Sequence, residues 1–150
     1  MSTLYAGVSR CIINPPLGIK TFGFSSREGV VQAIESDLTA TALVVSDGTV
    51  KIVVVATDTG WMAREVMNNL RRRVGDAIGT PASHVMINLN HTHSSPSMPE
   101  WCPAEPEQIA LQSTYQDPLC QWVIEAVQTA NDHMEPARIG ASWGESNIGV

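Results

Sequence analysis

The segment Lys51-Ile-Val-Val-Val-Ala-Thr57 decides the fold of this chain. Its residues are almost all apolar and mostly β-branched, which is typical of a central strand covered on both faces. This segment belongs to a β-branched run over Thr49–Thr57. A second such run, Thr39–Ser46, precedes it, and Asp47-Gly48 separates the two runs. Because this dipeptide tolerates the positive φ angles of a type I′ turn, we expect the two runs to form a β-hairpin.

The spacing of apolar residues changes directly after this hairpin. Apolar side chains then recur every fourth residue and predict an amphipathic helix that stops at Gly79: Met62, Val66, Leu70, Val74 and Ile78. Pro81–Asn90 returns to a short apolar strand, and a strand–helix–strand unit favours a parallel crossover. Asp58 and His91 would then follow the carboxyl ends of neighbouring strands, where open α/β sheets place their sites.

Three further elements complete the predicted fold. A first strand is expected at 5–13, Asp117-Pro118 is a good N-cap and first-turn pair for a second helix, and 136–143 resembles a last strand. Residues 22–37 show no period and are expected to form a long loop. The sequence therefore predicts an α/β fold, a mixed β-sheet with one β-hairpin and at least two packing helices.

Composition narrows the class of protein. The chain has 150 residues, the size of one domain, and its 43% hydrophobic and 16% charged residues indicate a globular protein. A net charge of −6 argues against nucleic-acid binding, and the one basic cluster, Arg71-Arg72-Arg73, would fan out around a helix. No apolar run approaches the roughly 20 residues of a transmembrane helix.

The amino terminus and the cysteines bear on location. The first residues lack the charged and apolar regions of a signal peptide, and the three cysteines show no CxxC spacing. We therefore expect a reduced, cytoplasmic chain, although a leader removed from a secreted protein would give the same picture. Cys11 and Cys120 lie among apolar residues and are expected to pack in the core.

The strongest chemical signal is His91-Thr92-His93-Ser94, at the end of the strand 85–90. Two imidazoles two residues apart project to the same side of an extended chain, and a divalent metal is the commonest reason for such convergence. Zinc held there would lower the pKa of a coordinated water to about 7 or polarise a carbonyl. The alternative is a polar turn in which both rings hydrogen-bond to the backbone.

Other donors are less clearly marked. Asp58 could ligate a metal, orient a ligating imidazole or cap the following helix. Glu100 and Cys102 are possible further donors, while Trp61 and Trp101 flank the two segments and could wall an apolar cleft. A catalytic zinc usually takes three protein ligands, and the sequence does not clearly supply all three.

Several blocks follow one another along the chain: Ala6-Gly7-Val8-Ser9-Arg10, Asn14-Pro15-Pro16-Leu17-Gly18, Gly23-Phe24, Ala42-Leu43-Val44-Val45 before Asp47-Gly48, Asp58, Asn90-His91-Thr92-His93-Ser94, and Gly140-Ala141-Ser142-Trp143-Gly144-Glu145 with Ile148-Gly149-Val150. In this order they resemble the amino-terminal part of the neutral/alkaline, non-lysosomal ceramidases, over essentially the whole chain. One departure is visible, because Ser95-Pro96-Ser97-Met98 follows the motif where that family usually continues with Gly-Pro-Gly-like residues.

The resemblance implies a zinc-dependent amidase that hydrolyses the N-acyl bond of ceramide, with a small lipid-like amide as its partner. It places a zinc ligand at His91 and puts His93 beside the zinc-bound water and the substrate. The family's remaining ligands, a His, a Glu and a Tyr, come from later in its catalytic domain. Residues 1–150 would then be a single domain or the N-terminal portion of a larger ceramidase-like catalytic domain. His93 and Asp58 are the candidate catalytic residues.

Two other functions stay open at this point. The chain could be a catalytically incomplete fragment or binding module. It could also be a different metal hydrolase that uses His91, His93 and Asp58 as its ligands, in which case this chain alone would bind zinc tightly and stoichiometrically.

Overall fold

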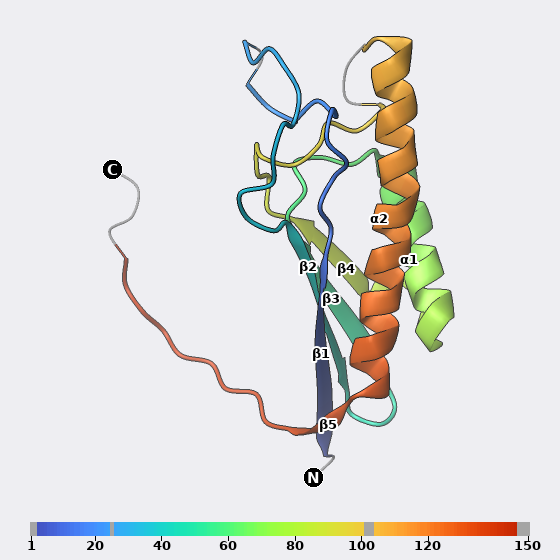
Figure 1. The fold of residues 1–150 in the computed structure, drawn as a ribbon. Coiled ribbons are helices and arrows are strands. Elements are labelled where there is room, and N and C mark those ends of the chain that lie inside the picture. Colours follow the sequence, from blue (N-terminus) through green and yellow to red (C-terminus); the bar gives the residue numbers. More distant parts are fainter. Residues whose placement is uncertain (1–2, 25, 101–103, 147–150) are drawn as a thin grey trace.

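The computed structural model describes residues 3–24, 26–100 and 104–146. Its centre is a five-stranded sheet in the order β4-β3-β2-β1-β5 (Figure 1). β3 and β4 are parallel, and every other neighbouring pair is antiparallel. The predicted mixed α/β fold is confirmed. The strands are β1 Leu4–Ile12, β2 Thr39–Ser46, β3 Lys51–Thr57, β4 Val85–Leu89 and β5 Glu135–Ala137.

The predicted hairpin joins β2 and β3, but its turn differs from the expected one. The connection comprises residues 47–50, and among them only Gly48 has a positive φ, of 89°. The Asp47 carboxylate accepts hydrogen bonds from the backbone N–H groups of Thr49 (2.9 Å) and Val50 (2.8 Å). The type I′ prediction is therefore wrong, because the Asp47 side chain closes a longer turn. The bonds from Val50 and Thr49 also lower the pKa of Asp47.

The first helix forms as the apolar spacing predicts. α1 spans Arg64–Ile78 and ends at Gly79, whose φ of 68° is left-handed and whose N–H bonds to the carbonyl of Gly75. A short 3-10 turn, η1 (Ala82–His84), leads from α1 into β4, and β4 pairs in parallel with β3. The predicted crossover is confirmed, so the ends of β3 and β4 meet at one edge of the sheet.

The second helix is longer than the sequence predicted. α2 spans Pro106–Asp132, with Pro118 in its interior, so the expected helix start at Asp117-Pro118 is wrong. An interior proline costs about 3 kcal/mol. Packing offsets this cost, because Tyr115 and Leu119 are both buried and the Tyr115 hydroxyl donates a 2.6 Å hydrogen bond to the carbonyl of Ile13. None of the helices formed by the described residues has the length and apolar character needed to cross a membrane.

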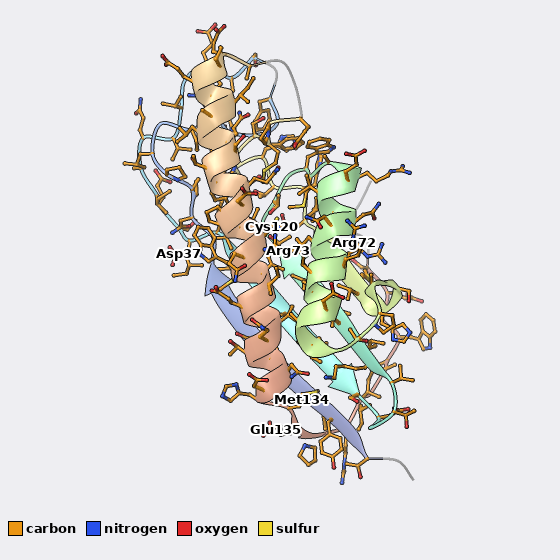
Figure 2. The ribbon with its side chains drawn as sticks, turned by 90° about the vertical axis from the view of Figure 1, so that its right-hand side faces the viewer. Asp37, Arg72, Arg73, Cys120, Met134 and Glu135 are labelled. Atoms are coloured by element: carbon orange, nitrogen blue, oxygen red, sulfur yellow. The ribbon has the colours of Figure 1, made fainter. Side chains whose placement is uncertain are left out.

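Both helices lie on the same face of the sheet (Figures 1 and 2). The core fills the space between this face and the helices, and includes Val44, Val53 and Val55 at 1% exposure or less. On the opposite face Val8 is 64% exposed and Met86 58% exposed. The expectation that β3 is covered on both faces is therefore wrong for the described part of the chain.

The carboxyl-terminal strand is shorter than expected. β5 contains only Glu135–Ala137, which pair with Leu4–Ala6 of β1. Residues 138–143 form neither helix nor strand, so the predicted strand over 136–143 holds only at its start. β1 begins at Leu4, which pairs with Ala137, so the pairing between β1 and β5 ends at these two residues.

The arginine cluster and the two described cysteines take the places that the sequence predicted. The Arg71 guanidinium donates to the carbonyl of Val85, Arg73 bonds to Gln121 of α2, and Arg72 is exposed, so the three side chains diverge. Figure 2 labels Arg72 and Arg73 on α1. Cys120 is buried and Cys11 half-buried, and burial raises the pKa of both thiols. These two cysteines therefore act as small core residues.

At Gly7 the backbone of β1 lies close against α2. A Cβ there would collide with the backbone carbonyl of Ala130, which cannot move without shifting the helix. We expect Gly7→Ala to lower the free energy of unfolding by about 3 kcal/mol, measured by urea denaturation. Gly144→Ala is the matched control, because a Cβ there meets nothing within 4 Å. Equal stability of both variants would contradict the predicted contact.

Candidate functional site

The Asp58 carboxylate follows the end of β3 and forms hydrogen bonds with the start of β2 and with the residue that follows β4. One oxygen accepts from the backbone N–H (2.7 Å) and hydroxyl (2.9 Å) of Thr39, at the start of β2. The other accepts from the side-chain amide of Asn90 at 2.5 Å. The Asn90 backbone N–H in turn bonds to the carbonyl of Thr57 (3.1 Å). Asp58 thus holds the residue that precedes His91, without a hydrogen bond to the imidazole itself.

His91 turns the chain where β4 ends. Its φ of 60° lies in the left-handed region, so the extended geometry expected for the two histidines is wrong. Its backbone N–H bonds to the carbonyl of Thr59 (3.2 Å), and its Nδ1 lies 2.9 Å from the carbonyl oxygen of Gly60. A carbonyl oxygen only accepts, so Nδ1 carries the proton and Nε2 of the neutral ring keeps its lone pair. His91 is exposed and has the tautomer of a metal-ligating histidine.

The His93 ring lies beside the His91 ring in spite of the turn between them. The ring centroids are 5.2 Å apart with an interplanar angle of 65°. Phe22 meets both imidazoles edge-on, at 5.1 Å from His91 and 5.3 Å from His93, and Phe24 lies 4.8 Å from His93. Within the described residues the His93 ring makes aromatic contacts and no hydrogen bond, so the polar-turn alternative holds for His91 only.

Two glycines allow this close packing. Gly23 has a φ of 80°, and a Cβ on it would overlap the ring of His93. A Cβ on Gly60 would overlap the ring of Phe22. The loop carrying Phe22 therefore lies directly against the histidine loop. No sequence pattern marks Phe22 itself as a site residue, but the neighbouring Gly23-Phe24 belongs to the ceramidase-like blocks and points to this loop.

Arg27 connects the histidine pair to a surface hollow of about 420 Å³. One guanidinium nitrogen donates to the carbonyl of His93 (2.7 Å) and to the hydroxyl of Thr21 (2.6 Å), while the guanidinium lies 4.7 Å from the ring centre of Phe24. Arg27 belongs to no motif, so the sequence alone does not predict it as a site residue. The hollow combines an apolar wall with polar residues next to His93: Val31, Ile34, Leu38, Arg27, Thr21 and Ser94.

A metal site would need more donors than the described residues bring together. Among 3–24, 26–100 and 104–146, no group of three or more His, Cys, Asp or Glu side chains is placed to hold a metal ion. The donor chemistry fits one zinc ligand, since His91 offers Nε2, whereas both Asp58 oxygens accept hydrogen bonds from Thr39 and Asn90. Glu100 is exposed, and Cys102 lies outside the described residues. The three-ligand set of His91, His93 and Asp58 is not assembled here.

The prediction that Trp61 and Trp101 wall an apolar cleft can be compared with the structure for Trp61 only. Trp61 is half-buried and packs against the core, and Trp122 packs there too and meets Tyr115 edge-on. Trp101, the other expected wall residue, lies outside the described residues, and Trp143 is fully exposed. The hollow beside Arg27 is lined by the loop over residues 31–38, whose apolar side chains alternate with polar ones such as Gln32 and Glu35.

Comparison with known proteins gives matches at the level of structure. No protein-family model matches the sequence. No curated protein matches it either. A solved ceramidase complexed with C2 has a TM-score of 0.76 to this structure at 20% sequence identity, and the neutral ceramidase from Pseudomonas aeruginosa has a TM-score of 0.72 at 19%. In each case the match covers 91% of this chain and 22% of the solved chain. The resemblance to neutral ceramidases is thus confirmed in the fold, over a minor part of their length.

The contribution of the Asp58 hydrogen bonds to stability can be tested with an isosteric substitution. In Asp58→Asn an amide NH₂ replaces one oxygen and must face a donor of either Thr39 or Asn90. We expect the free energy of unfolding to fall by about 2 kcal/mol, measured by urea denaturation. Asp76→Asn, on the exposed side of α1, should leave it unchanged. Undiminished stability of Asp58→Asn would mean that the carboxylate is free for another role.

Proposed function

We propose that this chain provides part of a zinc-dependent amide hydrolase of the ceramidase type, which cleaves the N-acyl bond of ceramide or a related N-acyl lipid. One observation carries the proposal: the Gly60 carbonyl holds His91 in the tautomer that leaves Nε2 for a metal, with the His93 ring 5.2 Å away. The ceramidase fold of the matched solved proteins supports it.

The chain's own residues divide the work as follows. Zinc bound through His91, together with ligands outside the described residues, would supply a Lewis acid that polarises the acyl carbonyl and activates water. His93 is close enough to the same point to donate a hydrogen bond to the developing oxyanion or to carry a proton to the leaving amine. A preorganised donor of this kind lowers the barrier by about 3 kcal/mol. Asp58 acts through Asn90 by fixing the start of the histidine loop.

The hollow beside His93 supports a lipid-like substrate. Val31, Ile34 and Leu38 give it an apolar wall, which suits a hydrocarbon chain. Arg27 stands between this wall and the carbonyl of His93, so a chain lying in the hollow would bring its polar end towards the histidines. An N-acyl amide joined to a long alkyl chain has this distribution of polarity.

A second function, a binding module without turnover of its own, is supported by a specific observation. The described residues place fewer than three potential metal ligands together, and the matched region is 22% of the solved ceramidase chains. Such a module would bind zinc weakly through His91 and hydrolyse nothing. An assay of residues 1–150 by themselves, with fluorescent ceramide and added zinc, distinguishes it from a self-sufficient hydrolase.

The two histidines should separate metal binding from turnover. Zinc is measured by elemental analysis after dialysis, and turnover with fluorescent ceramide on the longest polypeptide that the reading frame encodes. We expect His91→Ala to abolish zinc uptake. His93→Ala should keep most of the metal and lose about 100-fold in turnover. His133→Ala, whose ring bonds to the Thr129 carbonyl at the far end of α2, is the control and should change neither.

Each outcome has a defined reading. Unchanged zinc content in His91→Ala rules out that residue as a ligand. Full turnover in His93→Ala removes its catalytic role. Zinc uptake by the unaltered protein without hydrolysis of any N-acyl lipid favours the binding module.

A further inference from the structure

We propose that Ser95 is a positioning residue that sets the orientation and tautomer of His91. This inference rests on the proposed role of His91 as a metal ligand, but the contacts that carry it do not depend on a metal. Ser95 is fully buried at 0% exposure, directly beneath the exposed histidine loop. A buried hydroxyl needs partners, and those of Ser95 both lie on the segments that hold His91.

The Ser95 hydroxyl makes two hydrogen bonds. Its oxygen accepts from the backbone N–H of Gly60 at 2.8 Å, and its proton is donated to the carbonyl of Thr92 at 3.3 Å. The first bond fixes the segment after β3, and the second closes the turn that carries the two histidines. The Ser95 side chain therefore connects Gly60, whose carbonyl bonds to the His91 ring, with Thr92, the residue that follows His91.

The peptide unit between Thr59 and Gly60 lies at the centre of this arrangement. Its carbonyl accepts from the backbone N–H of His91, while its N–H, which points the opposite way in a trans peptide, donates to Ser95. His91 and Ser95 thus form hydrogen bonds with opposite sides of the same planar peptide group, that between Thr59 and Gly60. The next carbonyl, that of Gly60, is then directed at Nδ1 of His91, 2.9 Å away.

Phe22 completes the support. Its backbone N–H donates to the carbonyl of Ser95 at 2.8 Å, its ring lies against Gly60, and the same ring meets His91 edge-on at 5.1 Å. Without the Ser95 hydroxyl, the buried N–H of Gly60 would have no acceptor, and the Gly60 carbonyl could turn away from Nδ1.

The test reads the tautomer of His91 directly in zinc-free protein. Long-range ¹⁵N–¹H NMR on histidine-labelled chain, at mildly alkaline pH, reports which ring nitrogen carries the proton, and His91→Ala assigns the signal. We expect the unaltered protein to show only the Nδ1-protonated form. Ser95→Ala and Ser95→Gly should show a mixture of both tautomers. Zinc affinity, measured by competition with a fluorescent chelator, should fall about tenfold in both variants.

Ser97→Ala is the matched control, because Ser97 is a buried serine of the same loop and bonds to the carbonyl of Lys20 through its backbone N–H. It should leave the tautomer and the zinc affinity unchanged. An Nε2-protonated His91 in the unaltered protein overturns the proposal without any variant, and so does an unchanged tautomer in folded Ser95→Ala. If the unaltered chain binds no zinc, the metal function fails while the tautomer measurement still decides the role of Ser95.

Discussion

The hydrogen bonds of the Asp58 carboxylate are the constraint on which the rest of the site depends. A carboxylate that accepts from Thr39 and Asn90 ties the start of β2 to the ends of β3 and β4. Hydrogen bonds to a charged acceptor contribute about 2 kcal/mol each, more than neutral ones. Because the ends of β3 and β4 are hydrogen-bonded to each other at the same edge of the sheet, the segments that follow these two strands lie side by side. Gly60 and His91 meet for this reason.

A distant segment stiffens the same edge. Backbone hydrogen bonds join Phe22 to Ser95 and Lys20 to Ser97, so the loop after β1 runs along the histidine loop for several residues. Main-chain bonds of this kind form irrespective of side chains, but here the approach is close enough to need glycine at positions 23 and 60. The His91 ring thus has a backbone partner in the Gly60 carbonyl, and both imidazoles lie against the ring of Phe22. Such support is what a preorganised site needs.

The sequence predicted those features that depend on neighbouring residues in the chain. The β2–β3 hairpin and α1 follow from β-branched runs and a four-residue apolar spacing, and both are confirmed. Features set by distant contacts were missed. Pro118 is tolerated inside α2 because Tyr115 and Leu119 of the same helix are buried in the core. Helix propensity, which depends on local sequence, does not predict this packing. In the site, the spacing of His91 and His93 identified the pair, whereas Ser95 acts through contacts 35 residues away along the chain.

The left-handed backbone of His91 connects the fold to the proposed chemistry. A non-glycine residue with a φ of 60° costs about 1 kcal/mol or more and persists only where its surroundings fix it. Here the carbonyls of Thr59 and Gly60 accept from its backbone and ring, and the bonded Asn90 fixes the residue before it. An extended chain would have pointed both histidines to one side of β4, whereas the turn brings their rings together over Phe22. The left-handed turn at His91 thus lets one loop place two imidazole rings 5.2 Å apart.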